Sequence, residues 1–78
     1  MTTTDAFARQ VGGSHYKDMP IEPLKYILAN KLGFAEGNVV KYVTRWQSKG
    51  GLEDLRKASH YIDILIQHAE TEQAGNAA

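Results

Sequence analysis

Apolar residues recur at helical spacing between residues 22 and 48. A first helix is predicted over residues 22–32, with Pro23 at an early position where its missing N–H costs little. Gly33 then stands where a left-handed C-cap is expected. A second helix is predicted over residues 35–48. Its inner apolar stripe is formed by Val39, Val43 and Trp46.

The longest helix is predicted over residues 52–71, after a tight turn at Gly50 and Gly51 that makes the second and third helices antiparallel. Its stripe has heptad-like spacings of 3, 4, 3 and 4, at Leu55, Ala58, Ile62, Leu65 and Ala69. Tyr61, Ile64 and Ile66 widen this face beyond what one neighbouring helix covers. We therefore expect a homo-oligomer formed through the third helix; the alternative is that the N-terminal arm and the first helix cover it.

The chain ends carry no sustained apolar period. Residues 1–12 are predicted to be a flexible N-terminus, residues 13–20 an extended arm, and residues 72–78 a fraying tail. The expected fold is therefore all-α: a small three-helix domain, in which a helical hairpin and a short first helix follow the arm, within residues 13–71.

Size and charge narrow the class of protein. A chain of 78 residues without cysteine forms one domain with a modest core and no disulfide. Neither a membrane span nor a signal peptide is apparent, so a cytoplasmic protein without membrane contacts is expected. The formal net charge is zero, which does not favour binding to a long nucleic acid.

The clearest chemical feature is a cationic strip on the second helix. Its members are spaced by 3, 4 and 4 residues and lie on one side, at Asn38, Lys41, Arg45 and Lys49. No acid follows at i+4 along the strip, and such a row suits a phosphate group, to which Arg offers a fork and Lys a point charge. The alternative is a solvated face neutralised by Glu53, Asp54 or another subunit.

Two further groups extend this candidate site. Lys57, His60 and Tyr61 on the third helix lie near one flank of its stripe. Tyr42 lies beside the inner stripe of the second helix; it is interpreted first as a core or interface residue and is kept among the candidate ligand-binding residues.

The arm is the second candidate region. Its Gly12-Gly13 pair precedes Ser14, His15, Tyr16 and Lys17. These residue types suit a nucleotide, because Tyr16 offers a ring for the base or sugar, and Ser14, His15 or Lys17 offers a hydrogen-bond donor for phosphate. The alternative is a linker whose Tyr16 packs on the helices.

Other chemistry is not indicated. No Walker A loop occurs. The three histidines are not at metal-ligand spacing, so no metal site and no cofactor are predicted. Acidic clusters that would hold magnesium are lacking.

The segments Gly37 to Trp46 and Lys49 to Ile62, together with Ser14-His15-Tyr16 and Pro20 to Pro23, resemble a widespread family of small tailed-phage proteins. The similarity covers about residues 13–67. Most members have no assigned function, and one longer relative is a nucleotide kinase without the usual phosphate-binding loop. The resemblance implies a phage origin and a nucleotide ligand, held by the strip on the second helix and the His15-Tyr16 pair.

Three functions follow as hypotheses. The first is a non-enzymatic nucleotide binder in the cytoplasm of the infected host, which sequesters a nucleotide signal of host immunity. The second is a nucleotide kinase or related enzyme, in which Arg45 and Lys41 steady the phosphoryl group and His15 carries the proton. The third is a helical adaptor that binds a host protein. Binding without catalysis is slightly favoured, because acids and metal ligands for chemistry are lacking.

Overall fold

The computed structural model describes residues 19–77, with side chains up to residue 75, and confirms the all-helical fold. Residues 19–22 lead without regular structure into α1, Pro23–Ala29. Helix α2, Phe34–Arg45, continues into the π-helical turn η2, Trp46–Gly50, and α3 follows as Gly51–Ala77. The arm predicted over residues 13–20 lies, up to residue 18, outside the described residues, as does the predicted flexible N-terminus.

Helix α1 is shorter than the predicted 22–32 and ends in a different way. Pro23 is at its first turn, as predicted. The left-handed residue is Lys31 (φ 56°), not Gly33, whose extended backbone (φ −76°, ψ −179°) is the N-cap of α2. The Lys31 N–H bonds the Leu28 carbonyl at 3.2 Å, and the Leu32 N–H bonds the Ile27 carbonyl at 3.0 Å. These two bonds form a Schellman motif, so the chain leaves the helix before Leu32.

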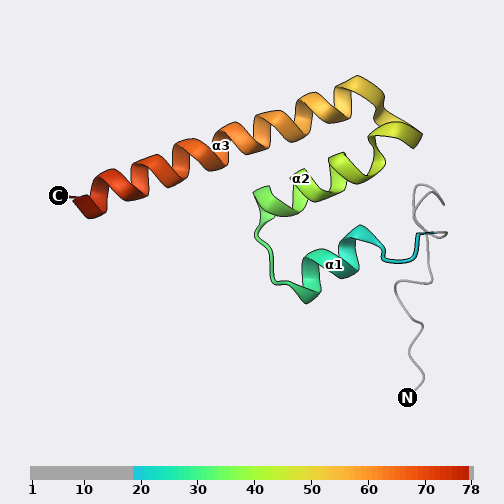
Figure 1. Ribbon diagram of the computed structural model, residues 1–78, viewed down its shortest axis with the longest axis horizontal. Helices are drawn as coiled ribbons and strands as arrows, with labels where there is room; N and C mark the ends of the chain where they lie inside the picture. The colour runs from blue at the N-terminus through green and yellow to red at the C-terminus, as the bar shows by residue number, and fades with distance from the viewer. Residues whose placement is uncertain (1–18, 78) are drawn as a thin grey trace, which may run out of the picture.

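Helices α2 and α3 form the predicted antiparallel hairpin, joined at Gly50 and Gly51 (Figure 1). Gly51 has φ 57° and ψ −143°, a backbone conformation in which a side chain is strained. The predicted second helix, 35–48, instead changes at Trp46 from α-helical to π-helical hydrogen bonding. The wider π-helical turn leads the chain into α3. The spacing of apolar residues in α2 could not indicate this change of hydrogen bonding.

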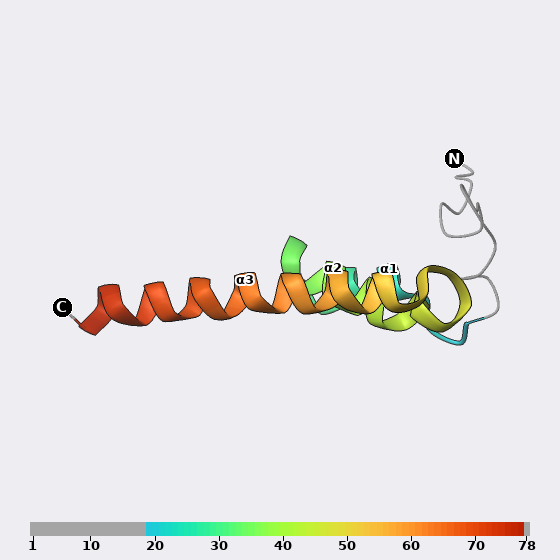
Figure 2. The same ribbon diagram turned by 90° about the horizontal axis from the view of Figure 1, so that it is seen from above.

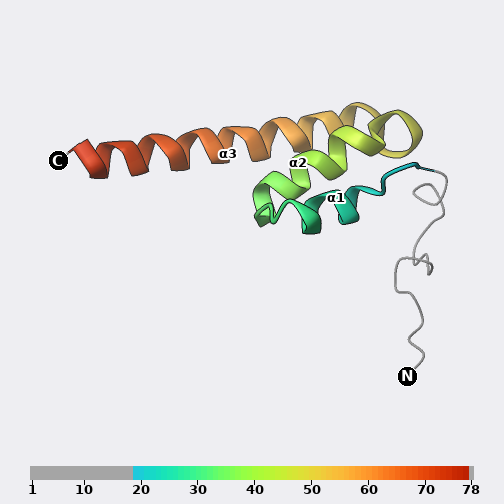
Figure 3. The same ribbon diagram turned by 60° about the horizontal axis from the view of Figure 1, so that its bottom comes forward.

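The C-terminal half of α3 runs past the end of α2, with no other described helix beside it (Figures 1 and 3). Helix α3 extends to Ala77, beyond the predicted end at residue 71, so most of the tail predicted over residues 72–78 belongs to this helix. Glu72, Gln73 and Ala74 are residue types that favour helix. One turn apart on this helix, the Nε2 atom of His68 lies 3.3 Å from Oε1 of Glu72.

The described helices lie in one layer (Figure 2). Helix α1 packs on α2 and makes no contact with α3 among the described residues, so it does not cover the face of α3. Gly37 of α2 is buried where a β-carbon would lie 3.2 Å from the Ile27 side chain of α1. Ala58 is the one buried hydrophobic residue of the described chain. A single layer therefore leaves many apolar side chains exposed, among them Phe34 and Val43.

Within residues 19–77, no helix combines the length and apolarity required to cross a membrane.

Candidate functional site

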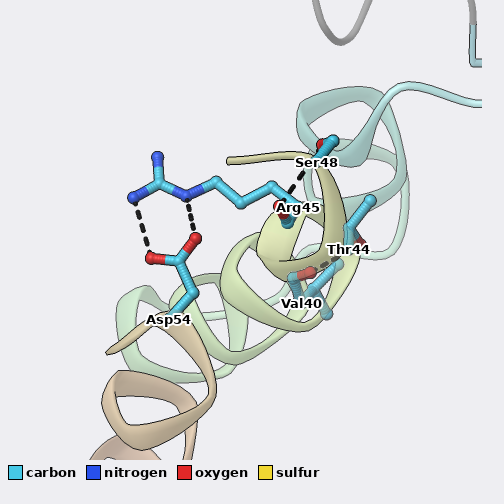
Figure 4. Close-up of polar contacts among 5 residues, drawn as sticks. All are labelled: Val40, Thr44, Arg45, Ser48 and Asp54. Carbon is cyan, nitrogen blue, oxygen red and sulfur yellow. Dashed lines mark hydrogen bonds and ion pairs between the residues drawn. The ribbon is translucent and has the colours of Figure 1, made fainter. Parts of the chain in front are cut away.

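Arg45, at the end of α2, forms a bidentate ion pair with Asp54 in the first turn of α3 (Figure 4). The Nε atom of Arg45 lies 2.9 Å from Oδ2 of Asp54, and Nη2 lies 3.2 Å from Oδ1. Asp54 is 1% exposed, although it is an acid, and the Arg45 side chain is 17% exposed. The pair therefore closes the hairpin from inside, in a geometry that only a guanidinium and a carboxylate match.

The turn between the helices makes room for this carboxylate. A β-carbon at Gly50 would overlap the carboxyl group of Asp54, so glycine is required there for space. The backbone of Gly50 lies beside the carboxylate and helps to lower its pKa. Hydrogen bonds from Arg45 hold the pKa of the Asp54 carboxyl below its usual value of 3.8, against the opposing effect of desolvation. The positive charges of Arg45 and Lys57 lower this pKa further.

Hydroxyl groups satisfy two carbonyls near the end of α2 (Figure 4). The Thr44 hydroxyl donates to the Val40 carbonyl at 2.6 Å, and the Ser48 hydroxyl donates to the Arg45 carbonyl at 3.3 Å. These bonds support the backbone where α-helical hydrogen bonding gives way to η2. Arg45 is thus fixed at both its backbone and its guanidinium.

Three cations surround the ring of Tyr42. Lys41 Nζ lies 4.6 Å from the ring centroid, Arg45 Cζ 4.9 Å and Lys57 Nζ 5.4 Å. All three distances are within the range of cation–π attraction. Lys57 comes from α3 and the other two from α2, so the hairpin brings together charges that are distant in sequence. Three positively charged side chains are therefore gathered at the Tyr42 ring.

Tyr61 of α3 continues this aromatic group. Its ring stacks on Tyr42 with a centroid separation of 6.2 Å and an interplanar angle of 19°. Phe34 meets Tyr61 edge-on at 6.1 Å, and the His60 ring is tilted at 6.3 Å. The contacts of Tyr61 with Phe34 and Tyr42 cross the hairpin and hold Tyr42 and Tyr61 in place, whereas His60 precedes Tyr61 on the same helix.

An open depression of about 450 Å³ lies beside these rings. Its volume is within the range of small-molecule sites. Basic and aromatic side chains dominate its lining, with one acid and one exposed isoleucine at its edge. The lining residues are Tyr42, Glu53, Arg56, Lys57, His60, Tyr61 and Ile64.

The predicted site residues separate into three groups in space. Tyr42, Lys57, His60 and Tyr61 line the depression. Lys41 and Arg45 lie against the Tyr42 ring. None of the four strip residues is among the lining residues of the depression. The Asn38 amide donates to the Phe34 carbonyl at 2.9 Å, and Lys49 is exposed in η2. Ser14, His15, Tyr16 and Lys17 lie outside the described residues.

Sequence reasoning missed the partner of Arg45. Asp54 was named only as one of several groups that could neutralise the strip. The Gly50-Gly51 turn between Arg45 and Asp54 could have indicated a direct pair across the hairpin. Glu53, Arg56 and Ile64 were also absent from the candidate site, because no periodicity shows that a depression lies beside Tyr42.

Within the described residues, no group of three or more histidines, aspartates or glutamates is arranged to hold a metal ion.

Neither a curated protein nor a solved structure shows detectable similarity to this chain. A family model described as a protein of unknown function (DUF3310) matches residues 11–63, which is more than half of the sequence. The match includes the hairpin turn, the Arg45–Asp54 pair and every lining residue of the depression except Ile64. The chain therefore belongs to the DUF3310 family of proteins of unknown function.

Proposed function

We propose that this protein binds a nucleotide or nucleotide-derived small molecule in the depression beside Tyr42. The observation that carries the proposal is the meeting of Lys41, Arg45 and Lys57 at one aromatic ring, next to a depression of about 450 Å³. A phosphate group is attracted by the cations, and a base or sugar is accommodated by an aromatic surface.

The lining of the depression supports an anionic ligand in particular. Arg56 and Lys57 supply charge at the site, and His60 offers a ring nitrogen. Glu53 is the acid of the lining and favours a ligand that also carries hydrogen-bond donors, such as a base amine or a ribose hydroxyl. A mixed ligand of this kind suits the site better than inorganic phosphate does.

The biological setting of the proposal follows from the resemblance to tailed-phage proteins. The protein is a phage product that acts in the cytoplasm of the infected cell, where it sequesters a nucleotide signal of host immunity. It works as a homo-oligomer through α3. This setting implies that the bound molecule is held without being changed.

The first experiment is a ligand screen with product analysis. The pure protein is incubated with nucleoside mono- and triphosphates, cyclic nucleotides and ADP-ribose derivatives, and the denatured sample is examined by chromatography. Recovery of the unchanged ligand supports sequestration. Transfer of phosphate to a new product supports the nucleotide kinase instead. If none of these compounds binds, both hypotheses are wrong and a protein-binding adaptor becomes the leading alternative.

A matched pair of variants tests the position of the site. Lys57→Gln removes a charge from the depression and should weaken binding about tenfold or more, as expected for a charge-assisted contact to phosphate. Lys31→Gln makes the same change at an exposed lysine between α1 and α2 and should leave the affinity unchanged. Equal affinities of the two variants would place the ligand elsewhere. Arg45→Ala is the poorer test, because it also leaves the buried Asp54 carboxylate without its guanidinium.

A further inference from the structure

A second apolar stripe runs along α3, on a side that α2 leaves open. Its members are spaced alternately by 3 and 4 residues, from Leu52 through Leu55, Ser59, Ile62, Ile66 and Ala69. Leu52 is 60% exposed, Ile62 42% and Ile66 51%. A helix with 3.6 residues per turn keeps such a 3–4 repeat on one face, as in a coiled-coil seam.

The apolar residues of this stripe are distinct from the depression, although Arg56 on the flank of the stripe also lines the depression. Lys57 and Ile64 are one residue beyond the charged flank of the stripe, on the side of α3 that lines the depression. The buried residues Asp54 and Ala58, on the face that packs on α2, lie between the stripe and the side of α3 that lines the depression. The stripe extends beyond α2 along the C-terminal half of α3, where no described helix covers it (Figures 1 and 3).

The core of a single copy does not account for so much exposed apolar surface. Ala58 is the one buried hydrophobic residue in the part of the chain that the structure describes. Small domains with cores of this size gain stability from association, and a heptad seam is the usual means for a helix. A second copy of the same chain carries the matching seam.

Charges beside the seam indicate the orientation of that copy. Arg56, Asp63 and Glu70 are spaced by seven residues and occupy the same flanking position of the repeat. In a parallel pair this flanking position of one copy would face Gly51, Ala58 and Leu65 of the other, which carry no charge. In an antiparallel pair centred on Asp63, Arg56 of each copy faces Glu70 of the other, which gives two attractive pairs against the one contact of Asp63 with its own equivalent.

Arg56 and Glu70 are exposed, and neither takes part in an ion pair among the described residues. The antiparallel register also places Ile66 of one copy against Ile62 of the other. We propose that two copies of this chain associate through an antiparallel pairing of the second α3 stripe, with reciprocal Arg56–Glu70 ion pairs. The pairing specifies the self-association included in the proposed function and does not depend on nucleotide binding.

A matched pair of isoleucine substitutions tests the seam. The mass of the full chain is measured by sedimentation or light scattering between about 1 and 100 µM, with helical content followed by circular dichroism. Ile66→Asp should give a folded monomer. Ile64→Asp, at a similarly exposed isoleucine (43%) of the depression, should remain associated and lose only ligand binding. Wild-type protein that is monomeric at 100 µM, or an Ile66→Asp variant that remains associated, overturns the proposal.

Charge reversal tests the orientation. Arg56→Glu and Glu70→Arg should each weaken association about tenfold or more, whereas the double variant should restore it. In a parallel pair these positions face uncharged residues, so neither single reversal would change association, and that result would refute the antiparallel register.

Because the chain has no cysteine, single cysteines give a second measurement that does not depend on destabilising the helix. Asp63→Cys should form a disulfide between copies under mild oxidation, because position 63 meets itself across the two-fold axis. Glu70→Cys should not, because it faces Arg56. Crosslinking of neither variant, or of both to the same extent, refutes the antiparallel register.

Discussion

Arg45 and Asp54, which belong to different helices, are joined by two hydrogen bonds of 2.9 and 3.2 Å, and the carboxylate is 1% exposed. The same guanidinium lies 4.9 Å from the centre of the Tyr42 ring. One residue thus connects the closure of the hairpin to the cationic cluster at the depression. Arg45 consequently has a structural role in addition to any contact with a ligand.

Asp54→Asn should destabilise the fold strongly. The amide retains the shape of the carboxylate but loses its charge and presents an NH₂ group toward a guanidinium that itself only donates. We expect the melting temperature, measured by circular dichroism, to fall by roughly 10 °C or more. Glu36→Gln also neutralises an acid, at an exposed position of α2 away from the α3 seam, and should alter the melting temperature little. Similar effects of the two variants would mean that the buried pair is not a main support of the hairpin.

The same carboxylate predicts how stability depends on pH. Hydrogen bonds from Arg45 lower the pKa of Asp54 in the folded state, so the unfolded chain binds a proton more readily than the folded chain does. The stabilisation is therefore complete above the ordinary aspartate pKa of about 3.9 and is lost as the pH falls through the lowered value. Acid unfolding at fixed temperature should show this loss below about pH 4 in the wild type. In Asp54→Asn the corresponding loss should be absent; an unchanged acid transition would contradict the assignment.

Gly50→Ala should damage the same contact from the backbone side. A β-carbon at Gly50 would overlap the Asp54 carboxyl group, so either the turn or the ion pair must shift. The expected cost is about 1–3 kcal/mol in the free energy of unfolding, measured by urea denaturation. Gly75→Ala is the control, because no atom lies within 4 Å of the added carbon and alanine favours helix. That variant should be as stable as the wild type or slightly more so.

The left-handed Lys31 predicts a stabilising substitution. Its φ of 56° strains a residue with a β-carbon, and glycine adopts this conformation without that cost. Lys31→Gly should raise the free energy of unfolding by about 0.5–1 kcal/mol, once the extra freedom of glycine in the unfolded chain is subtracted. Lys25→Gly, in the interior of α1, should instead lower it by about 1 kcal/mol. A loss of stability in both variants would show that Lys31 contributes more than its backbone conformation.

The helical fold could be predicted from the sequence because its signals are local. Apolar spacing indicated three helices, and Pro23 and the Gly50-Gly51 pair indicated where α1 starts and where the hairpin turns. The end of α1 could not be placed in this way, because a lysine took the left-handed position for which Gly33 was the better candidate. The extent of α3 was underestimated because Gly75 and the small polar residues around it resemble a frayed end.

The candidate site was predictable only in part, because it depends on how two helices face each other. Helical spacing aligned Lys41 and Arg45 correctly on one side of α2. It could not show that Arg45 turns toward Asp54, or that Lys57 of α3 approaches Tyr42. Tyr42 was assigned first to the core, yet its half-buried ring both stacks on Tyr61 and lines the depression.

Substitutions of Tyr42 separate the contribution of its ring to binding from that of its hydroxyl. Tyr42→Phe retains the ring against which Lys41, Arg45 and Lys57 lie, and it should bind the nucleotide identified by the screen within about twofold of the wild type. Tyr42→Leu removes the aromatic surface and the cation–π contacts, and should weaken binding about tenfold. Isothermal titration at two salt concentrations gives both affinities. Binding to the wild type should also weaken as salt rises, because the cations of the site are partly exposed to solvent. If Tyr42→Phe loses as much affinity as Tyr42→Leu, the ligand contacts the hydroxyl and not the face of the ring, and the stacked orientation of the base is wrong.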